Sequence, residues 1–258
     1  MTTREGNVVI KVFEEKLSEA YKLPFYRVTP FEVWGKLGTR AGRPVTHSID
    51  TYKIHEGIID DLAKEYIDDA QKHLAAVGMT GVFGGPVGVA TAILDLEEYV
   101  RVMYRLAQEL GYLYGVLPSP FISGSELSSM SDDDYMYNIR GDILKVIAIG
   151  SGIGGVSLAV TEVAKRIAQK EAREILSKKI SDKVITQLIK QIAKVLGVKI
   201  TKKTISKTVL RVVPVVGGII SAGINYMAIG KLGENMKNGL KKEREKYREL
   251  LIESGFLA

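Results

Sequence analysis

Three long stretches of the chain combine an absence of charged residues with a high glycine content. They cover Leu74–Leu94, Val146–Thr161 and Val212–Gly230. Glycine lowers helix stability by about 1 kcal/mol relative to alanine, so its repeated use needs a physical reason. Close approach of one helix backbone to another, or to lipid, supplies that reason. The pattern therefore predicts tightly packed helices that either form a core or meet a membrane.

The segments between these stretches predict amphipathic helices. Residues 48–73 and 96–114 each place apolar residues three or four positions apart, with charged residues on the other face. Gly115 predicts the end of the second of these helices. Further long helices are expected within 157–196 and 231–254, and strand-like alternation is rare. The predicted fold class is all-α, a compact bundle of helical hairpins with glycine-rich apolar helices at its centre.

Prolines and glycines mark the expected breaks in this bundle. Gly84-Gly85-Pro86 interrupts the first apolar stretch, which predicts two short helices that meet at a bend. Residues 1–50 are expected to form an irregular N-terminal segment, because 21–47 hold three prolines and three glycines. Residues 51–258 form the predicted helical domain. Serine, aspartate, proline and glycine make 117–142 a candidate internal linker.

Composition sharpens this interpretation. The chain has 258 residues, 46% hydrophobic and 26% charged, and a mean hydropathy of +0.06, so charge and apolarity must be segregated along it. It has no cysteine, which excludes disulfides, zinc-thiolate sites and cysteine nucleophiles. The charged N-terminus does not resemble a secretory signal. We therefore expect a cytoplasmic protein that associates peripherally with membranes.

The net charge of +6 is concentrated in the second half of the chain. Lysine and arginine dominate in Lys199–Arg211 and Lys237–Arg248. Basic segments beside apolar stretches favour an anionic membrane surface as a partner. Nucleic acid is not an expected partner, because no aromatic residues alternate with these lysines. Solvated helix faces would account for most of the same charge.

The segment Val146–Ala159 contains the spacing of a dinucleotide-binding fingerprint, with glycines at Gly150, Gly152 and Gly155. That motif also needs a second strand that ends in an acidic residue about twenty positions later. Residues 164–180 predict a charged helix instead. We therefore favour a glycine-lined helix contact, expect no cofactor, and keep a dinucleotide-dependent enzyme as an alternative.

Other chemical sites have weaker support. Asp69 and His73 share a helix face, but a two-helix metal site needs a second carboxylate–histidine pair, and none is visible. No serine nucleophile stands in a strand-turn-helix elbow. We expect no metal and no catalytic residue.

Two parts of the chain resemble the EcsC protein family. The first is 74–115, through Gly78–Gly88 (GMTGVFGGPVG), Asp95, Arg105 and Tyr114-Gly115. The second is 185–240, through IAKVLGVKIT and VPVVGGIISAGIN. The family takes its name from a gene beside a bacterial ABC transporter, and its biochemical role is poorly defined. The resemblance implies a bacterial, non-secreted protein linked to membranes or export, and it carries no established catalytic residues.

Together these observations predict a non-enzymatic protein that associates with lipid or a membrane, by binding an acyl chain or inserting glycine-rich hairpins. A membrane transporter or secretion system is a further candidate partner. The alternative is a soluble helical accessory protein whose apolar stretches are fully buried. Asp95 and Asn225 are expected to cap helices or line a polar mouth. The residues expected to contact lipid are Gly78, Gly81, Phe83, Gly84, Gly85, Gly88, Gly152, Gly155, Gly217, Gly218 and Gly223.

Overall fold

The computed structural model describes residues 3–80, 86–120, 129–154, 182–205 and 214–257. Only the backbone is described for 3–9, 78–80, 86–95, 197–205 and 214–225. All regular structure in these residues is helical, so the predicted all-α bundle is confirmed.

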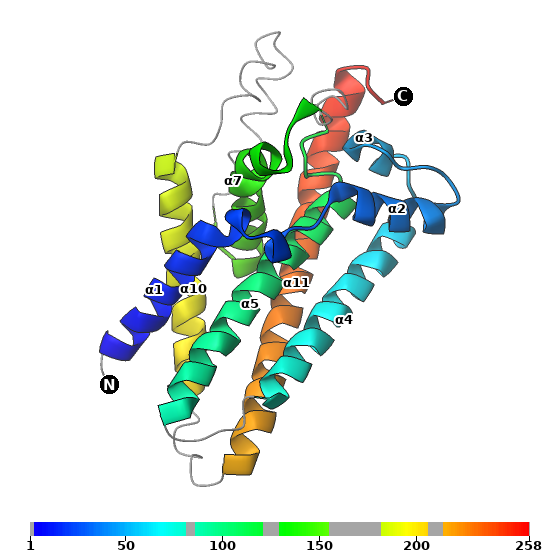
Figure 1. The fold of residues 1–258 in the computed structure, drawn as a ribbon. Coiled ribbons are helices and arrows are strands. Elements are labelled where there is room, and N and C mark those ends of the chain that lie inside the picture. The colour runs from blue at the N-terminus through cyan, green and yellow to red at the C-terminus, as the bar shows by residue number, and fades with distance from the viewer. Residues whose placement is uncertain (1–2, 81–85, 121–128, 155–181, 206–213, 258) are drawn as a thin grey trace.

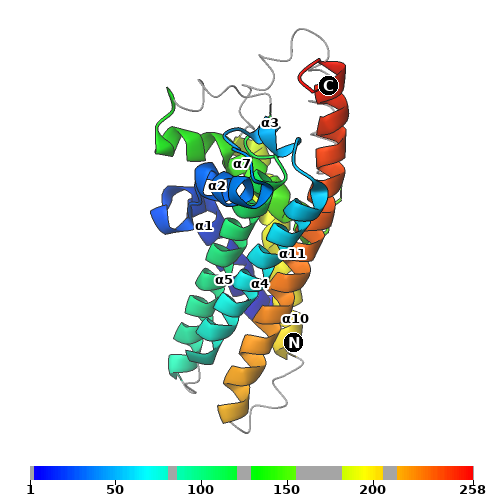
Figure 2. The same cartoon turned by 90° about the vertical axis from the view of Figure 1, so that its right-hand side faces the viewer.

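Long helices within the described residues run along a common direction and form the bundle (Figure 1). They are α4 (Glu56–Thr80), α5 (Pro86–Leu113), α7 (Asp132–Ser151), α10 (Asp182–Ile205) and α11 (Pro214–Glu253). Helix α1 (Thr3–Glu19) packs along α10, and α11 packs along α4. Figure 2 shows α4, α5 and α11 side by side over most of the length of the bundle. The shorter elements are η1 (Ala20–Lys22), η2 (Pro24–Tyr26), α2 (Pro30–Ala41) and α3 (Ser48–Thr51).

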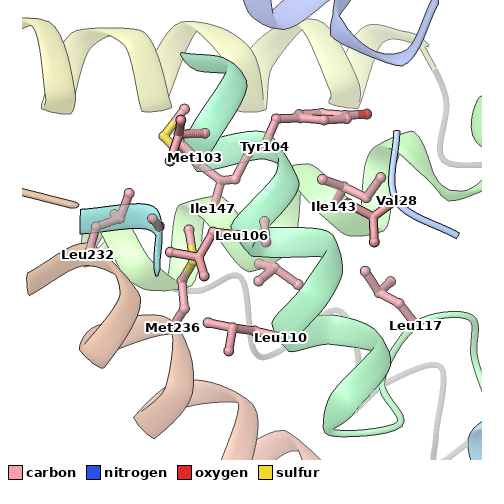
Figure 3. Packing of buried hydrophobic residues seen from close by; sticks show 14 of the residues in the cluster. Val28, Met103, Tyr104, Leu106, Leu110, Leu117, Ile143, Ile147, Leu232 and Met236 are labelled. Carbon is pink, nitrogen blue, oxygen red and sulfur yellow. The ribbon is translucent and has the colours of Figure 1, made fainter. Parts of the chain in front are cut away.

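Helix α5 is the central helix of the bundle and contacts α1, α2, α4, α7 and α11. Met103, Leu106 and Leu110 in its C-terminal half are fully buried. Figure 3 shows these side chains packed near Ile147 of α7 and Met236 of α11. Each buried side chain of this size contributes about 1.5–3 kcal/mol through removal from water. The C-terminal half of α5 therefore anchors the core.

The N-terminal segment is more regular than expected, because it contains α2. The Thr29 hydroxyl accepts a hydrogen bond from the Glu32 amide, and Pro30 occupies the first helical position, where a missing N–H costs nothing. Trp34 is fully buried and donates its indole N–H to the Tyr112 carbonyl at 3.2 Å. The prediction of an irregular segment over 1–50 was therefore wrong, because three prolines also suit helix starts and turns.

The break in the first apolar stretch falls where Gly84-Gly85-Pro86 predicts it, between α4 and α5. The helices on either side are long, however, because each continues without interruption into an amphipathic helix. The predicted linker at 117–142 also extends too far. Helix α7 begins at Asp132, where the Ser131 hydroxyl accepts a hydrogen bond from the Asp134 amide at 3.2 Å. The polar residues Ser131–Asp134 therefore form the N-terminus of a helix and do not belong to a linker.

Some glycines of the apolar stretches lie at helix contacts, as predicted. A Cβ on Gly150 of α7 would lie 2.5 Å from Met236 Cγ and 3.0 Å from the Leu232 carbonyl oxygen of α11. A Cβ on Gly230 would lie 2.2 Å from the Gln71 side chain of α4. At Gly150 the backbone oxygen of Leu232 leaves no room for a larger residue, whereas at Gly230 the end of the Gln71 side chain would have to move. Glycine therefore lets α7 and α4 approach α11 closely.

The dinucleotide fingerprint has a different structural basis. The residues that precede Gly150 belong to helix α7, whereas the fingerprint requires a strand there. Gly152 ends α7 with a left-handed backbone, at φ 78°. Gly155 lies outside the described residues. In the described part of the motif, glycine serves helix packing and helix termination.

The bundle end opposite the α4–α5 connection is held by a buried arginine. Arg244 of α11 is 1% exposed, and its guanidinium donates to the Thr51 carbonyl at 2.8 Å and the Tyr114 carbonyl at 3.1 Å. It also lies 4.5 Å from the centroid of the Tyr52 ring. Gly115, at φ 69°, turns the chain beside this cluster. These contacts join α11 to α3 and to the end of α5.

Candidate functional site

The charge-free parts of three helices lie together at one end of the bundle, the lower end in Figures 1 and 2. They are 74–80 of α4, 86–94 of α5 and 214–230 of α11. We call these three segments the apolar end. With a rise of about 1.5 Å per residue, they extend about 10 Å, 13 Å and 25 Å along their helices. Chain segments far apart in sequence thus form one feature.

Several of the residues expected to contact lipid fall at the apolar end. Gly78 lies in α4, Gly88 in α5, and Gly217, Gly218 and Gly223 in α11. The expected contacts at Gly81, Phe83, Gly84, Gly85 and Gly155 lie outside the described residues.

The structure adds detail to three further expectations. Gly152 terminates α7 with a left-handed backbone, which accounts for glycine at this position, and its contact with lipid stays a prediction. The described part of the second apolar stretch, 146–154, supplies core residues, including Val146 and Ile147. Asp95 lies inside α5 and Asn225 inside α11, so neither occupies the cap position of its own helix, and their expected polar contacts stay predictions.

Polar side chains border the apolar end. The His73 ring lies 2.5 Å from a Glu98 carboxylate oxygen, to which Arg101 Nε also donates at 3.0 Å. On α11, Tyr226 is 40% exposed and Met227 is 61% exposed. The charge-free parts of α4 and α5 therefore give way to charged residues at a similar level along the two helices.

A second candidate site is a cavity of about 490 Å³. We call it the α4–α5 cavity, because most of its walls come from these helices, with additions from η2 and α2. It is lined by Phe25, Lys36, Tyr66, Asp69, Ala70, His73, Arg101, Val102, Arg105 and Glu109. This site was not predicted from the sequence, because its residues come from four elements. One signal was present: Arg101, Arg105 and Glu109 recur every four residues and share a face of α5.

The charged groups in this cavity differ in whether they form an ion pair, a hydrogen bond or neither. Arg101 pairs with Glu98, and Arg105 donates to the Arg27 carbonyl at 2.8 Å. Glu109 has no hydrogen bond or ion pair with the described residues. Burial raises the pKa of its carboxyl group to about 7, although Arg105 and Lys36 act in the opposite direction. The cavity therefore contains a carboxyl group that changes charge near neutral pH.

Two other kinds of site are absent from the described residues. Among the described helices, none has both the length and the apolarity needed to cross a membrane. No group of three or more acidic or histidine side chains suited to a metal ion occurs in the described part of the chain. Comparison with protein-family models, curated proteins and solved structures found no match.

Proposed function

We propose that the protein binds the surface of an anionic membrane by inserting its apolar end into one leaflet, and that it acts without catalysis. The observation that carries this proposal is the gathering of three charge-free helix segments at one end of the bundle. A soluble protein rarely collects so much uncharged helix at a single end unless that end meets a partner.

The dimensions of the apolar end support shallow insertion. The hydrocarbon core of a bilayer is about 30 Å thick, so one leaflet provides about 15 Å. The charge-free parts of α4 and α5, at about 10 and 13 Å, fit within that depth. Beyond them, His73, Glu98 and Arg101 would meet the headgroup layer, where charged groups stay hydrated. The charge-free part of α11, at about 25 Å, is longer and continues into the bundle, where Gly230 packs against Gln71 of α4.

The charge near the α10–α11 connection supports an anionic surface. Lys202 and Lys203 lie in the last turns of α10, and Lys207 and Arg211 follow before α11 begins. Each basic residue near such a surface contributes about 1 kcal/mol to binding. The resemblance to the EcsC family agrees with this proposal and suggests an accessory role beside a membrane transporter.

The experiment that tests the proposal is vesicle flotation of the purified protein without detergent. Vesicles of phosphatidylcholine with phosphatidylglycerol are compared with vesicles of phosphatidylcholine alone. We expect flotation with the anionic vesicles, and weaker flotation at high salt as the electrostatic part is screened.

A pair of matched variants then locates the inserting end. Phe83→Asp changes the α4–α5 connection, and Phe256→Asp changes a phenylalanine that is 58% exposed at the opposite end. Burial of a phenylalanine is worth about 1.5–3 kcal/mol, so Phe83→Asp should weaken vesicle binding by roughly tenfold or more. Phe256→Asp should bind like the wild type, and circular dichroism checks that both variants fold. Equal binding by the two variants, or no flotation of the wild type, would refute the proposal and favour burial of the apolar end against a protein partner.

A further inference from the structure

The α4–α5 cavity has two cationic side chains that form no ion pair with a described carboxylate. Arg105 directs its guanidinium to backbone carbonyls, those of Arg27 at 2.8 Å and Phe25 at 3.4 Å. The Lys36 ammonium lies 5.0 Å above the centre of the Tyr66 ring. The remaining acidic residue of the wall, Asp69, lies 3.6 Å from Lys72 and is largely exposed. The cavity therefore has positive charge available for an anion.

Glu109 reinforces this character when it is protonated. A neutral carboxyl group donates a hydrogen bond to an anion, whereas the ionised form repels it. The charged and titratable groups around Glu109 in the cavity are Glu32 and Lys36 on α2, Tyr66, Asp69 and His73 on α4, and Arg101 and Arg105 on α5. Burial nevertheless keeps about half of the Glu109 side chains protonated near pH 7, because it raises the pKa to about 7.

The rest of the cavity suits a short apolar or aromatic body. Phe25 of η2 is 52% exposed, and Tyr66, Ala70 and Val102 supply buried apolar wall. An exposed phenylalanine beside a cavity offers a flat face for stacking. The volume of about 490 Å³ is within the range of small-molecule sites, about 300–1,000 Å³.

We propose that the α4–α5 cavity binds a small organic anion, a carboxylate or phosphate ester with a short apolar or aromatic body. Lys36 and Arg105 attract the anionic group, protonated Glu109 donates a hydrogen bond to it, and Phe25 and Tyr66 contact the body. This inference does not depend on the membrane proposal, because none of these residues belongs to the apolar end.

Benzoate is a suitable probe, because its own charge is constant between pH 6 and pH 8. We expect saturable chemical-shift changes at the backbone amides of Ala70 and Val102 when full-length protein is titrated with benzoate. The protonated fraction of Glu109 falls about tenfold from pH 6 to pH 8, so binding by the wild type should weaken by up to about tenfold. Glu109→Gln should remove this pH dependence and retain the binding seen at pH 6.

A matched pair of lysine variants tests the cationic group. Lys36→Ala should weaken benzoate binding at pH 6 by about tenfold, whereas Lys64→Ala, an exposed position of α4 outside the cavity, should bind like the wild type. Vesicles with phosphatidylglycerol distinguish the source of the anion: displacement of benzoate identifies a lipid headgroup, and no displacement identifies a free organic acid. The absence of saturable shifts, or equal binding by the two lysine variants, would overturn the proposal.

Discussion

Replacement of Gly150 by alanine tests whether glycine in the apolar stretches serves helix contact. The added Cβ would lie 2.5 Å from Met236 Cγ and 3.0 Å from the Leu232 carbonyl oxygen. A backbone oxygen cannot move without displacing α11, and Met236 is fully buried. Overpacking of this kind costs about 1–3 kcal/mol. Helix propensity acts in the opposite direction, since alanine gains about 1 kcal/mol over glycine.

Gly35→Ala is the matched control. Gly35 lies inside α2, is exposed, and has no heavy atom within 4 Å of the added Cβ. Both variants gain the same helix propensity, so their difference in stability isolates the overpacking, about 1–3 kcal/mol. For a chain of this size, that difference corresponds to roughly 3–9 °C in Tm. Thermal and urea unfolding followed by circular dichroism measure it, and equal stability of Gly150→Ala and Gly35→Ala would refute the helix-contact interpretation.

Three further predictions concern stability. Burial raises the pKa of Glu109 from 4.5 to about 7, so the stability from its protonated form is full below about pH 4.5 and is lost as pH rises through 7. Glu109→Gln should therefore exceed the wild type in free energy of unfolding by about 3 kcal/mol at pH 8, and by almost nothing at pH 4.5, as measured by urea unfolding. Burial disfavours ionisation of Asp60, but hydrogen bonds from Lys241 and Tyr114 lower its pKa overall. Asp60→Asn should lower the free energy of unfolding by about 0.5–1 kcal/mol at pH 7. This difference from the wild type should disappear as pH falls through the pKa of Asp60 in the folded state. Gly115→Ala should lower Tm by roughly 5 °C or more, because its φ is 69° and the new Cβ would lie 2.9 Å from the Ser48 carbonyl oxygen; an unchanged Tm would contradict this account.

The two candidate sites address different chemistry. The apolar end is proposed to contact membrane hydrocarbon through uncharged helix segments. The α4–α5 cavity is proposed to bind an anion through two cationic side chains and an ionisable carboxyl group. Lys36, Arg105 and Glu109 of the cavity lie outside the three segments of the apolar end, so loss of one binding activity should leave the other intact. Flotation of Lys36→Ala and benzoate titration of Phe83→Asp measure this independence.

The sequence by itself determined the features that depend on neighbouring residues. Gly84-Gly85-Pro86 marks the break between α4 and α5, and Gly115 follows the end of α5, because glycine and proline restrict the local backbone. Apolar spacing gave the all-α class for the same local reason. The same local signals gave a wrong prediction in the N-terminal segment, because Pro30 starts a helix there and does not interrupt one.

Only the tertiary structure decided which distant residues meet. Gly150 contacts α11 while Gly152 ends a helix, although the two glycines stand two positions apart in one motif. Lys36, Tyr66 and Glu109 line one cavity from three helices, and the ends of α4, α5 and α11 gather at one end of the bundle. Such contacts depend on how helices pack against each other, and helical periodicity specifies the face that is buried without specifying its neighbour.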